Sequence, residues 1–199
     1  SSIQDKVSHS NCGVLLIGQC EPWIKNESLV ALVETLGWTT IVDATHHYLK
    51  SLPNVAHSAD MAIDEMAGIE FDCVLYIGGP WVSKKMAAFM SQHPEKIIHI
   101  TESYRPLVNL KRQSVEMSVS ELKGLTSNIG GSVDIIGDIN RRSSDKVYEK
   151  LSKDSEFKAV YHALLSIDGP IDCFVSNSMP IRYIDQLKLP MINKLYCNR

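Results

Sequence analysis

Short apolar runs alternate with helical patterns along the first half of the chain, and this alternation restricts the fold more than any other feature. The apolar runs, rich in β-branched residues, occupy 13–18, 39–43, 71–77 and 96–101. Segments with apolar residues at helical spacing occupy 26–36, 59–67 and 84–92. Such alternation is typical of parallel strands that are connected by helices. The sequence therefore predicts a doubly wound α/β fold, with a mostly parallel sheet and helices on both faces.

Small polar residues and a glycine mark the ends of two predicted helices. We expect Asn26 to cap the first helix and Gly37 to end it, while Ser83 caps a helix that continues to Gln92. The second half of the chain gives weaker patterns. There we predict an edge strand at 115–119, a strand at 132–136, a helix at 145–166 with a break near 154–155, a buried core strand at 171–175, a helix at 181–187 and a strand at 194–197.

The size and composition fit one domain. A chain of 199 residues, of which 44% are hydrophobic, can bury one sizeable core. We expect a polar N-terminal tail at 1–11 and a single α/β domain at 12–199. The formal net charge is −3, and no basic stripe interrupts the mixture of acids and bases. These features argue against nucleic acid as a partner.

The sequence also bears on location and on the cysteines. The first residues lack the apolar core of a signal peptide, and no later apolar run is long enough to cross a bilayer. We therefore expect a cytoplasmic protein with no membrane span. The chain has five cysteines without a CxxC motif, and three of them lie in apolar runs. We expect reduced thiols in place of a metal site or disulfides.

One candidate binding site is the turn after the third predicted strand. It reads GGPWVSKK from Gly78 to Lys85, so two glycines precede a capping serine and the pair Lys84 and Lys85. Exposed backbone amides and a helix N-terminus suit an anion. The alternative is a simple helix cap with solvated lysines. The spacing matches neither a Walker motif nor the GxGxxG fingerprint.

A second candidate follows the predicted strand at 171–175. The sequence VSNSMPIR places Asn177, Ser178 and Arg182 beyond the carboxyl end of that strand, where open α/β sheets bind ligands. Ser178 and Arg182 have the i, i+4 spacing that brings two side chains to one side of a helix. An arginine suits bidentate recognition of a carboxylate. The alternative is that a serine caps the helix and Arg182 is solvated.

His46 and His47 are adjacent and have no further ligand at a metal spacing, so we interpret them as loop histidines. We expect Asp43 to cap the turn that follows its strand. The sequence contains no GxSxG nucleophile elbow and no convincing acid/base pair. Taken alone, the residues indicate an anion-receptive α/β domain without identifiable catalytic machinery.

Two stretches carry a specific resemblance: FVSNSMPIRYID and, shortly after it, LYCNR. They resemble the end of the central domain of the 2-succinyl-5-enolpyruvyl-6-hydroxy-3-cyclohexene-1-carboxylate synthase family, the thiamine-diphosphate enzymes of menaquinone biosynthesis. In that family a segment GNSMPIR precedes a strand that ends in SNRG. Upstream, LYIGGPWVSKKMAAF and GVLLIGQC are similar to other parts of the same domain. The resemblance implies the Rossmann-like central domain of a thiamine-diphosphate enzyme.

The resemblance also assigns residues to substrate binding. In the family the corresponding positions face the carboxylates of isochorismate and of the succinyl unit made from 2-oxoglutarate. The matching residues here are Lys84, Lys85, Asn177, Ser178, Arg182 and Arg199. Three positions depart from the family pattern: Ser176 replaces the usual glycine, Tyr183 replaces a frequent acid, and Lys85 replaces a frequent arginine. No catalytic residue and no metal ligand is assigned to this chain.

Such synthases use thiamine diphosphate with Mg²⁺ or Mn²⁺, held by an N-terminal and a C-terminal domain, and act as homo-oligomers. The motifs of those two domains are missing from this sequence. We therefore expect a central domain cut from a longer three-domain transferase, inactive alone and binding no cofactor itself. One alternative is a stand-alone α/β module that binds an anionic metabolite or nucleotide. Another is a structural domain that only buries an interface.

Overall fold

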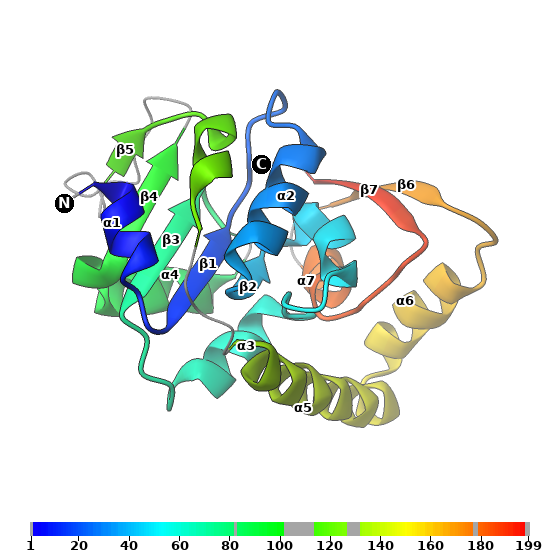
Figure 1. Ribbon diagram of the computed structural model, residues 1–199. Helices are drawn as coiled ribbons and strands as arrows, with labels where there is room; N and C mark the ends of the chain where they lie inside the picture. Colours follow the sequence, from blue (N-terminus) through cyan, green and yellow to red (C-terminus); the bar gives the residue numbers. More distant parts are fainter. Residues whose placement is uncertain (1, 82, 102–113, 127–131, 177–178, 198–199) are drawn as a thin grey trace.

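Five parallel strands form the central sheet of the protein (Figure 1). The computed structural model describes residues 2–81, 83–101, 114–126, 132–176 and 179–197. The strands are β1 (Gly13–Ile17), β2 (Thr39–Val42), β3 (Cys73–Ile77), β4 (Ile97–Thr101) and β5 (Ser114–Glu116). Their order is β2-β1-β3-β4-β5, so the chain starts in the interior of the sheet and crosses β1 to reach β3.

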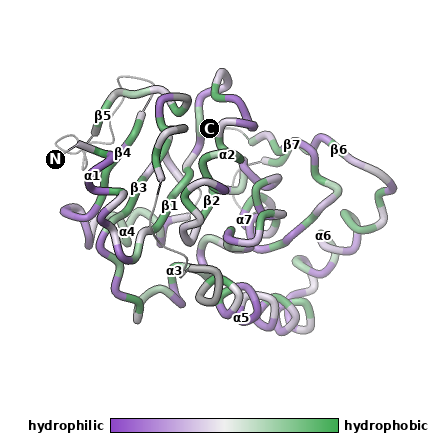
Figure 2. The backbone as a smooth tube through the Cα atoms, in the orientation of Figure 1, coloured by the Kyte–Doolittle hydropathy of each residue, from purple (hydrophilic) through white to green (hydrophobic). Residues whose placement is uncertain are grey.

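The central strands are apolar because both of their faces are covered. Every residue of β1, β2, β3 and β4 is buried, as expected for parallel strands between two helical layers. Neighbouring residues point to opposite faces: Leu15 packs in one core cluster and Leu16 in the other. Figure 2 shows hydrophobic colour along much of these strands. The predicted doubly wound α/β fold is confirmed.

Helical segments cover both faces of this sheet. The first core cluster contains residues of α1 (Ile3–Ser8), α2 (Asn26–Leu36), η1 (Ala44–Ser51) and η4 (Val119–Gly124). The second contains residues of α3 (Ala59–Met66), α4 (Lys84–Gln92) and the first turns of α5 (Ser132–Lys153). A short η2 (Pro94–Lys96) leads into β4.

The C-terminal part of the chain forms a second, smaller sheet beside the first (Figure 1). This part of the chain consists of α6 (Ser155–Leu165), β6 (Ile171–Val175), α7 (Met179–Asp185) and β7 (Ile192–Cys197). Strands β6 and β7 pair in parallel, and their inner side shares a third apolar cluster with Phe157, Ile181 and Ile184. We call this unit the C-terminal lobe.

Two predictions for the second half of the chain are wrong. Residues 171–175 are not a buried core strand, because β6 alternates between half-buried and exposed positions, and Phe174 is 67% exposed. The segment 132–136 is the start of helix α5 instead of a strand. A short apolar run fits either structure until its neighbours are known, and here Ile136 and Ile139 pack together against the sheet. The predicted helix break is confirmed, since Asp154 caps α6 by accepting from the Phe157 amide at 2.9 Å.

The N-terminal segment and the first helix boundary also differ from expectation. Residues 3–8 form helix α1 in place of a polar tail, with a capping box between Ser2 and Asp5 and with Val7 fully buried. Asn26 lies inside α2 and not at its cap. Gly37 does end that helix, in the left-handed conformation at φ 62° that glycine adopts most readily.

Two further findings concern membranes and cysteines. Within the described residues, no helix combines the length and the apolar character needed to cross a bilayer. All five cysteines are free thiols. Cys73 is buried and the other four are partly buried.

Candidate functional site

The turn after β3 does not provide the free amides that the sequence suggested. The Gly78 amide donates to the Ile100 carbonyl at 3.1 Å, and the Gly79 amide donates to the Gln19 carbonyl at 2.7 Å. A Cβ at Gly18 would lie 2.2 Å from the Gly79 carbonyl oxygen. The loops after β1 and β3 therefore fill the point at which the strand order reverses, where open sheets often bind ligands. The amides of Gly78 and Gly79 are therefore engaged within the protein.

Ser83 fixes the start of α4 and the position of the lysine pair. Its hydroxyl oxygen accepts from the Met86 amide at 3.1 Å, and its hydroxyl donates to the Asp60 carboxylate. This confirms the predicted cap. Lys84 and Lys85 lie in the first turn of α4 with exposed side chains.

Helix α7 presents Arg182 on its outer side. Ile181 and Tyr183 on either side of the arginine are buried. Tyr183 packs against the ring of Phe157, with ring centroids 5.3 Å apart, and Lys150 Nζ lies 5.0 Å from the tyrosine ring centroid. An aromatic residue at this position thus serves the core of the C-terminal lobe, while Arg182 stays exposed.

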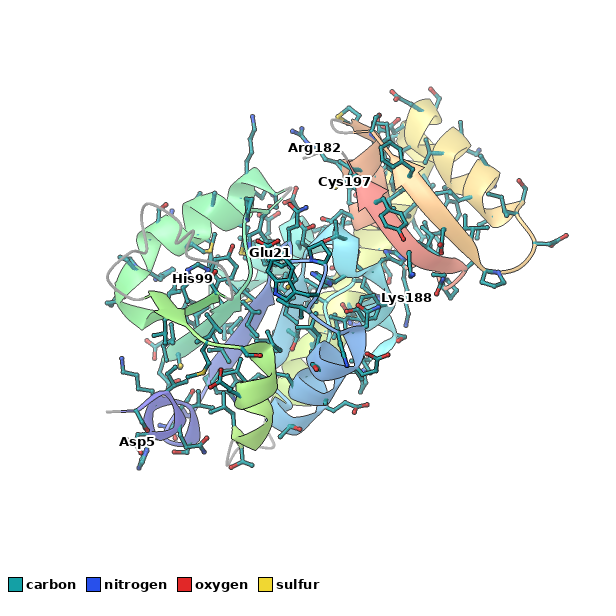
Figure 3. All side chains as sticks on the ribbon, turned by 90° about the horizontal axis from the view of Figure 1, so that it is seen from above. Asp5, Glu21, His99, Arg182, Lys188 and Cys197 are labelled. Atoms are coloured by element: carbon teal, nitrogen blue, oxygen red, sulfur yellow. The ribbon has the colours of Figure 1, made fainter. Side chains whose placement is uncertain are left out.

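The first turn of α4 and the helix α7 meet at a small hollow. It has a volume of about 90 Å³ and is lined by Asp60, Ser83, Lys84, Lys85, Arg182 and Asp185. We call it the cationic hollow. Figure 3 shows Arg182 where the C-terminal lobe faces the rest of the molecule. The fold therefore brings together three of the predicted site residues from distant parts of the sequence.

Three cations and two acids line the cationic hollow. Lys85 Nζ pairs with the Asp64 carboxylate at 2.7 Å. Within the described part of the chain, neither Lys84 nor Arg182 has an acidic partner at ion-pair distance. An anion in the hollow could be contacted by both of these cations, and a guanidinium is suited to the planar geometry of a carboxylate.

A buried ion pair lies behind the hollow. Lys50 is 1% exposed and its Nζ donates to the Asp185 carbonyl at 2.6 Å. The same Nζ lies 3.6 Å from Asp185 Oδ1. Burial raises the pKa of Asp185 to about 6, and the nearby Lys50 acts in the opposite direction. Burial lowers the pKa of Lys50.

His46 and His47 are buried structural residues and not loop side chains in solvent. His46 Nε2 donates to the Gly18 carbonyl at 2.9 Å, and His47 Nε2 accepts from the Leu189 amide at 2.8 Å. Burial lowers the pKa of His47 to about 3. Asp43 accepts from the Thr45 amide at 3.2 Å and so caps η1, as predicted.

Three predicted site residues, Asn177, Ser178 and Arg199, lie outside the described residues. Sequence reasoning missed Asp185, which lines the hollow. Its spacing of i, i+3 from Arg182 was a usable signal, because such residues share one side of a helix. Lys50 offered no signal, since nothing in its local sequence places it beneath α7.

Two larger depressions are also present, and the larger of them shares Lys85 with the cationic hollow. A groove of about 710 Å³ runs between α3 and α4 and has an apolar floor that includes Met66, Phe71 and Phe89. A cleft of about 650 Å³ separates the loop after β1 from β7. We select the smaller hollow as the candidate site because Lys84 and Arg182, two of the predicted site residues, both line it.

Side chains that commonly ligate metals do not cluster within the described residues. Across these ranges, no group of three or more His, Cys, Asp or Glu side chains is placed to hold a metal ion. No chemical step through thiamine diphosphate or its metal is assigned to these residues. Comparison of the chain with family models and with curated protein sequences finds no match.

Proposed function

We propose that this chain is the central domain of a thiamine-diphosphate-dependent synthase of menaquinone biosynthesis, in which it binds the carboxylates of the substrates. The parent enzyme would decarboxylate 2-oxoglutarate and add the resulting succinyl unit to isochorismate. The observation that carries the proposal is the meeting of Lys84 and Arg182 at one hollow. The sequence resemblance assigns both residues to substrate carboxylates.

In this proposal the chain contributes binding and orientation. Both acids carry two carboxylates, and a carboxylate that enters the cationic hollow can be contacted by Arg182 and Lys84 together. The hollow is too small for either molecule as a whole, so it would hold one carboxylate and its neighbouring atoms. The rest of the substrate would extend toward groups outside this chain, including the cofactor.

Titration calorimetry of the 199-residue chain with 2-oxoglutarate and with isochorismate tests the proposal. At least one of the acids should bind, and Arg182→Gln should weaken binding about 10-fold to 100-fold, because a hydrogen bond between charged groups contributes about 1.5–3 kcal/mol. Lys84→Gln should act in the same direction. Lys158→Gln is the matched control, since Lys158 is exposed on α6 and does not line the hollow.

Three results would contradict the proposal. The first is the absence of binding for both acids. The second is binding that Arg182→Gln and Lys158→Gln affect equally. The third is turnover of the two acids by this chain without any added protein, since the proposal assigns the chemistry to other domains. Binding of a nucleotide such as AMP in place of the acids would favour the stand-alone module.

A further inference from the structure

Lys85 lies in the wall between the cationic hollow and the larger groove that runs between α3 and α4. Its ammonium is bound on the groove side, because Nζ donates to both carboxylate oxygens of Asp64, at 2.8 Å and 2.7 Å. Asp64 lines the groove and not the hollow. One of the three cations that line the hollow is therefore engaged by an acid that lies outside it.

Helix α3 presents two acids toward the first turn of α4, and these acids have different partners. Asp60 and Asp64 are four residues apart and so lie on one side of the helix. Asp60 lines the hollow and accepts a hydrogen bond from the Ser83 hydroxyl. Asp64 pairs instead with Lys85. Asp64 thus binds a cation of the hollow without adding its own carboxylate to the lining.

The ion pair between Asp64 and Lys85 is of a kind that exchanges. The Lys85 side chain is 50% exposed and the Asp64 side chain is 46% exposed, and ion pairs in contact with water contribute little to stability. A lysine ammonium stands on a flexible four-carbon stem, so it can change its partner while the backbone stays in place. An anion in the hollow would therefore compete with Asp64 for Lys85.

We infer that Asp64 is a positioning residue of the cationic hollow, which withholds the ammonium of Lys85 from a bound carboxylate. Lys84 and Arg182 contact the carboxylate directly, and Lys85 joins them only when the carboxylate displaces Asp64. The inference rests on the proposed carboxylate-binding function and adds to it a residue that limits the affinity. It predicts that loss of an ion pair tightens binding, which is a result that damage to the fold would not produce.

Titration calorimetry of the 199-residue chain with 2-oxoglutarate and with isochorismate, in about 0.15 M salt to screen distant charges, tests the inference. Asp64→Asn should lower the Kd of the acid that binds by about 2-fold to 5-fold, because it removes a competitor whose exposed ion pair has about that strength. Asp64→Glu keeps the competing carboxylate and should restore the wild-type Kd. Glu70→Gln is the matched control and should leave Kd unchanged, since Glu70 is an acid of the same groove whereas the partner of Lys85 is Asp64.

The same comparison in a Lys85→Met background shows whether Asp64 acts through the lysine. In that background Asp64→Asn should leave Kd unchanged, because no ammonium remains to be released. Both positions are exposed on their helices, so the variants should fold, which circular dichroism checks.

The outcomes separate this inference from the carboxylate-binding proposal. If an acid binds to the wild type and Asp64→Asn leaves its Kd unchanged or raises it, the carboxylate site stands and the inference about Asp64 is wrong. The inference is also wrong if the tightening persists in the Lys85→Met background or if Glu70→Gln produces it equally, because the charge then acts at a distance. If neither acid binds to the wild type, the inference falls together with the function on which it rests.

Discussion

The central sheet and the C-terminal lobe are both built from parallel strands, but different forces hold them. Strands β1, β2, β3 and β4 are buried at every position, so the burial of apolar surface on two faces stabilises the sheet. Strands β6 and β7 bury one side only, and Phe174 and Tyr196 point to solvent.

The contact between the two regions includes buried polar groups as well as apolar ones. Lys50 donates to the Asp185 carbonyl and His47 accepts from the Leu189 amide. The segment η1 therefore contacts the C-terminal lobe through two buried ionisable side chains, and such side chains are stable only when they are neutral or paired. The site residues lie along this boundary, with Lys84 on the sheet side and Arg182 on the lobe side. The polar contacts between the C-terminal lobe and the central sheet thus lie next to the hollow in which we propose that an anion binds.

The largest effect is expected from breaking the buried ion pair between the regions. Lys50→Met should lower the free energy of unfolding by about 3–5 kcal/mol, because it leaves the Asp185 carboxylate buried without its cation. Urea denaturation at neutral pH measures this change. The control is Lys50→Met/Asp185→Leu, which should recover most of the loss. Equal destabilisation of both variants would mean that packing of the lysine chain, and not charge pairing, joins the regions.

A pair of truncations sharpens the contrast between the two sheets. Leu16→Ala in β1 should lower the free energy of unfolding by about 2–5 kcal/mol, since Leu16 is fully buried between the layers. Phe174→Ala in β6 should change it by no more than about 0.5 kcal/mol, because most of that ring is already in water. Thermal and urea unfolding compare the two. A large loss from Phe174→Ala would show that the outer face of the lobe is covered in solution.

A smaller effect is expected from pH, again at the boundary. The folded-state pKa of His47 is lowered to about 3 by burial, while the unfolded chain titrates near 6.5. The stabilising contribution is therefore complete above pH 6.5 and is lost as the pH falls toward 3. Between pH 6 and pH 5, His47 alone should remove about 1 kcal/mol from the free energy of unfolding.

Other groups also titrate between pH 6 and pH 5, and together with His47 they determine how the free energy of unfolding changes with pH. The pKa values of His46 and His57 are also lowered by burial, that of His57 to about 4, so both add to the loss. Asp185 opposes it, because its raised pKa of about 6 lets the folded state take up a proton first. Urea midpoints at the two pH values, for the wild type and His47→Gln, measure the contribution of His47. An identical slope in both proteins would contradict the assignment.

Much of the central sheet could be predicted because its signals are local. Strands β1 and β3 are continuous apolar runs, and the helices that follow them have an apolar stripe and an identifiable end or start, as at Gly37 and Ser83. A parallel sheet covered by helices is the architecture that buries such elements together. The lysine pair and Arg182 were also identified from sequence as candidate anion ligands.

The tertiary structure decided what local patterns leave open. Residues 132–136 became helix because Ile136 and Ile139 pack against the sheet. Residues 171–175 became a half-exposed strand because one face of it packs in the apolar cluster of the lobe while Asp172 and Phe174 on the other face are exposed. Whether a backbone amide is free to bind an anion depends on the neighbouring loop. Here the Gly79 amide already donates to the Gln19 carbonyl.

The set of residues at the candidate site also depends on tertiary structure. The sequence alone was enough for the strands and helices of the central sheet and for the identity of the charged side chains, because hydrophobic periodicity and caps act over a few residues. Only the tertiary structure brought Lys84 to Arg182 and buried Lys50 behind Asp185. Burial and pairing of charges depend on residues that are distant in sequence, since electrostatic energies are set by distance and desolvation in the folded chain.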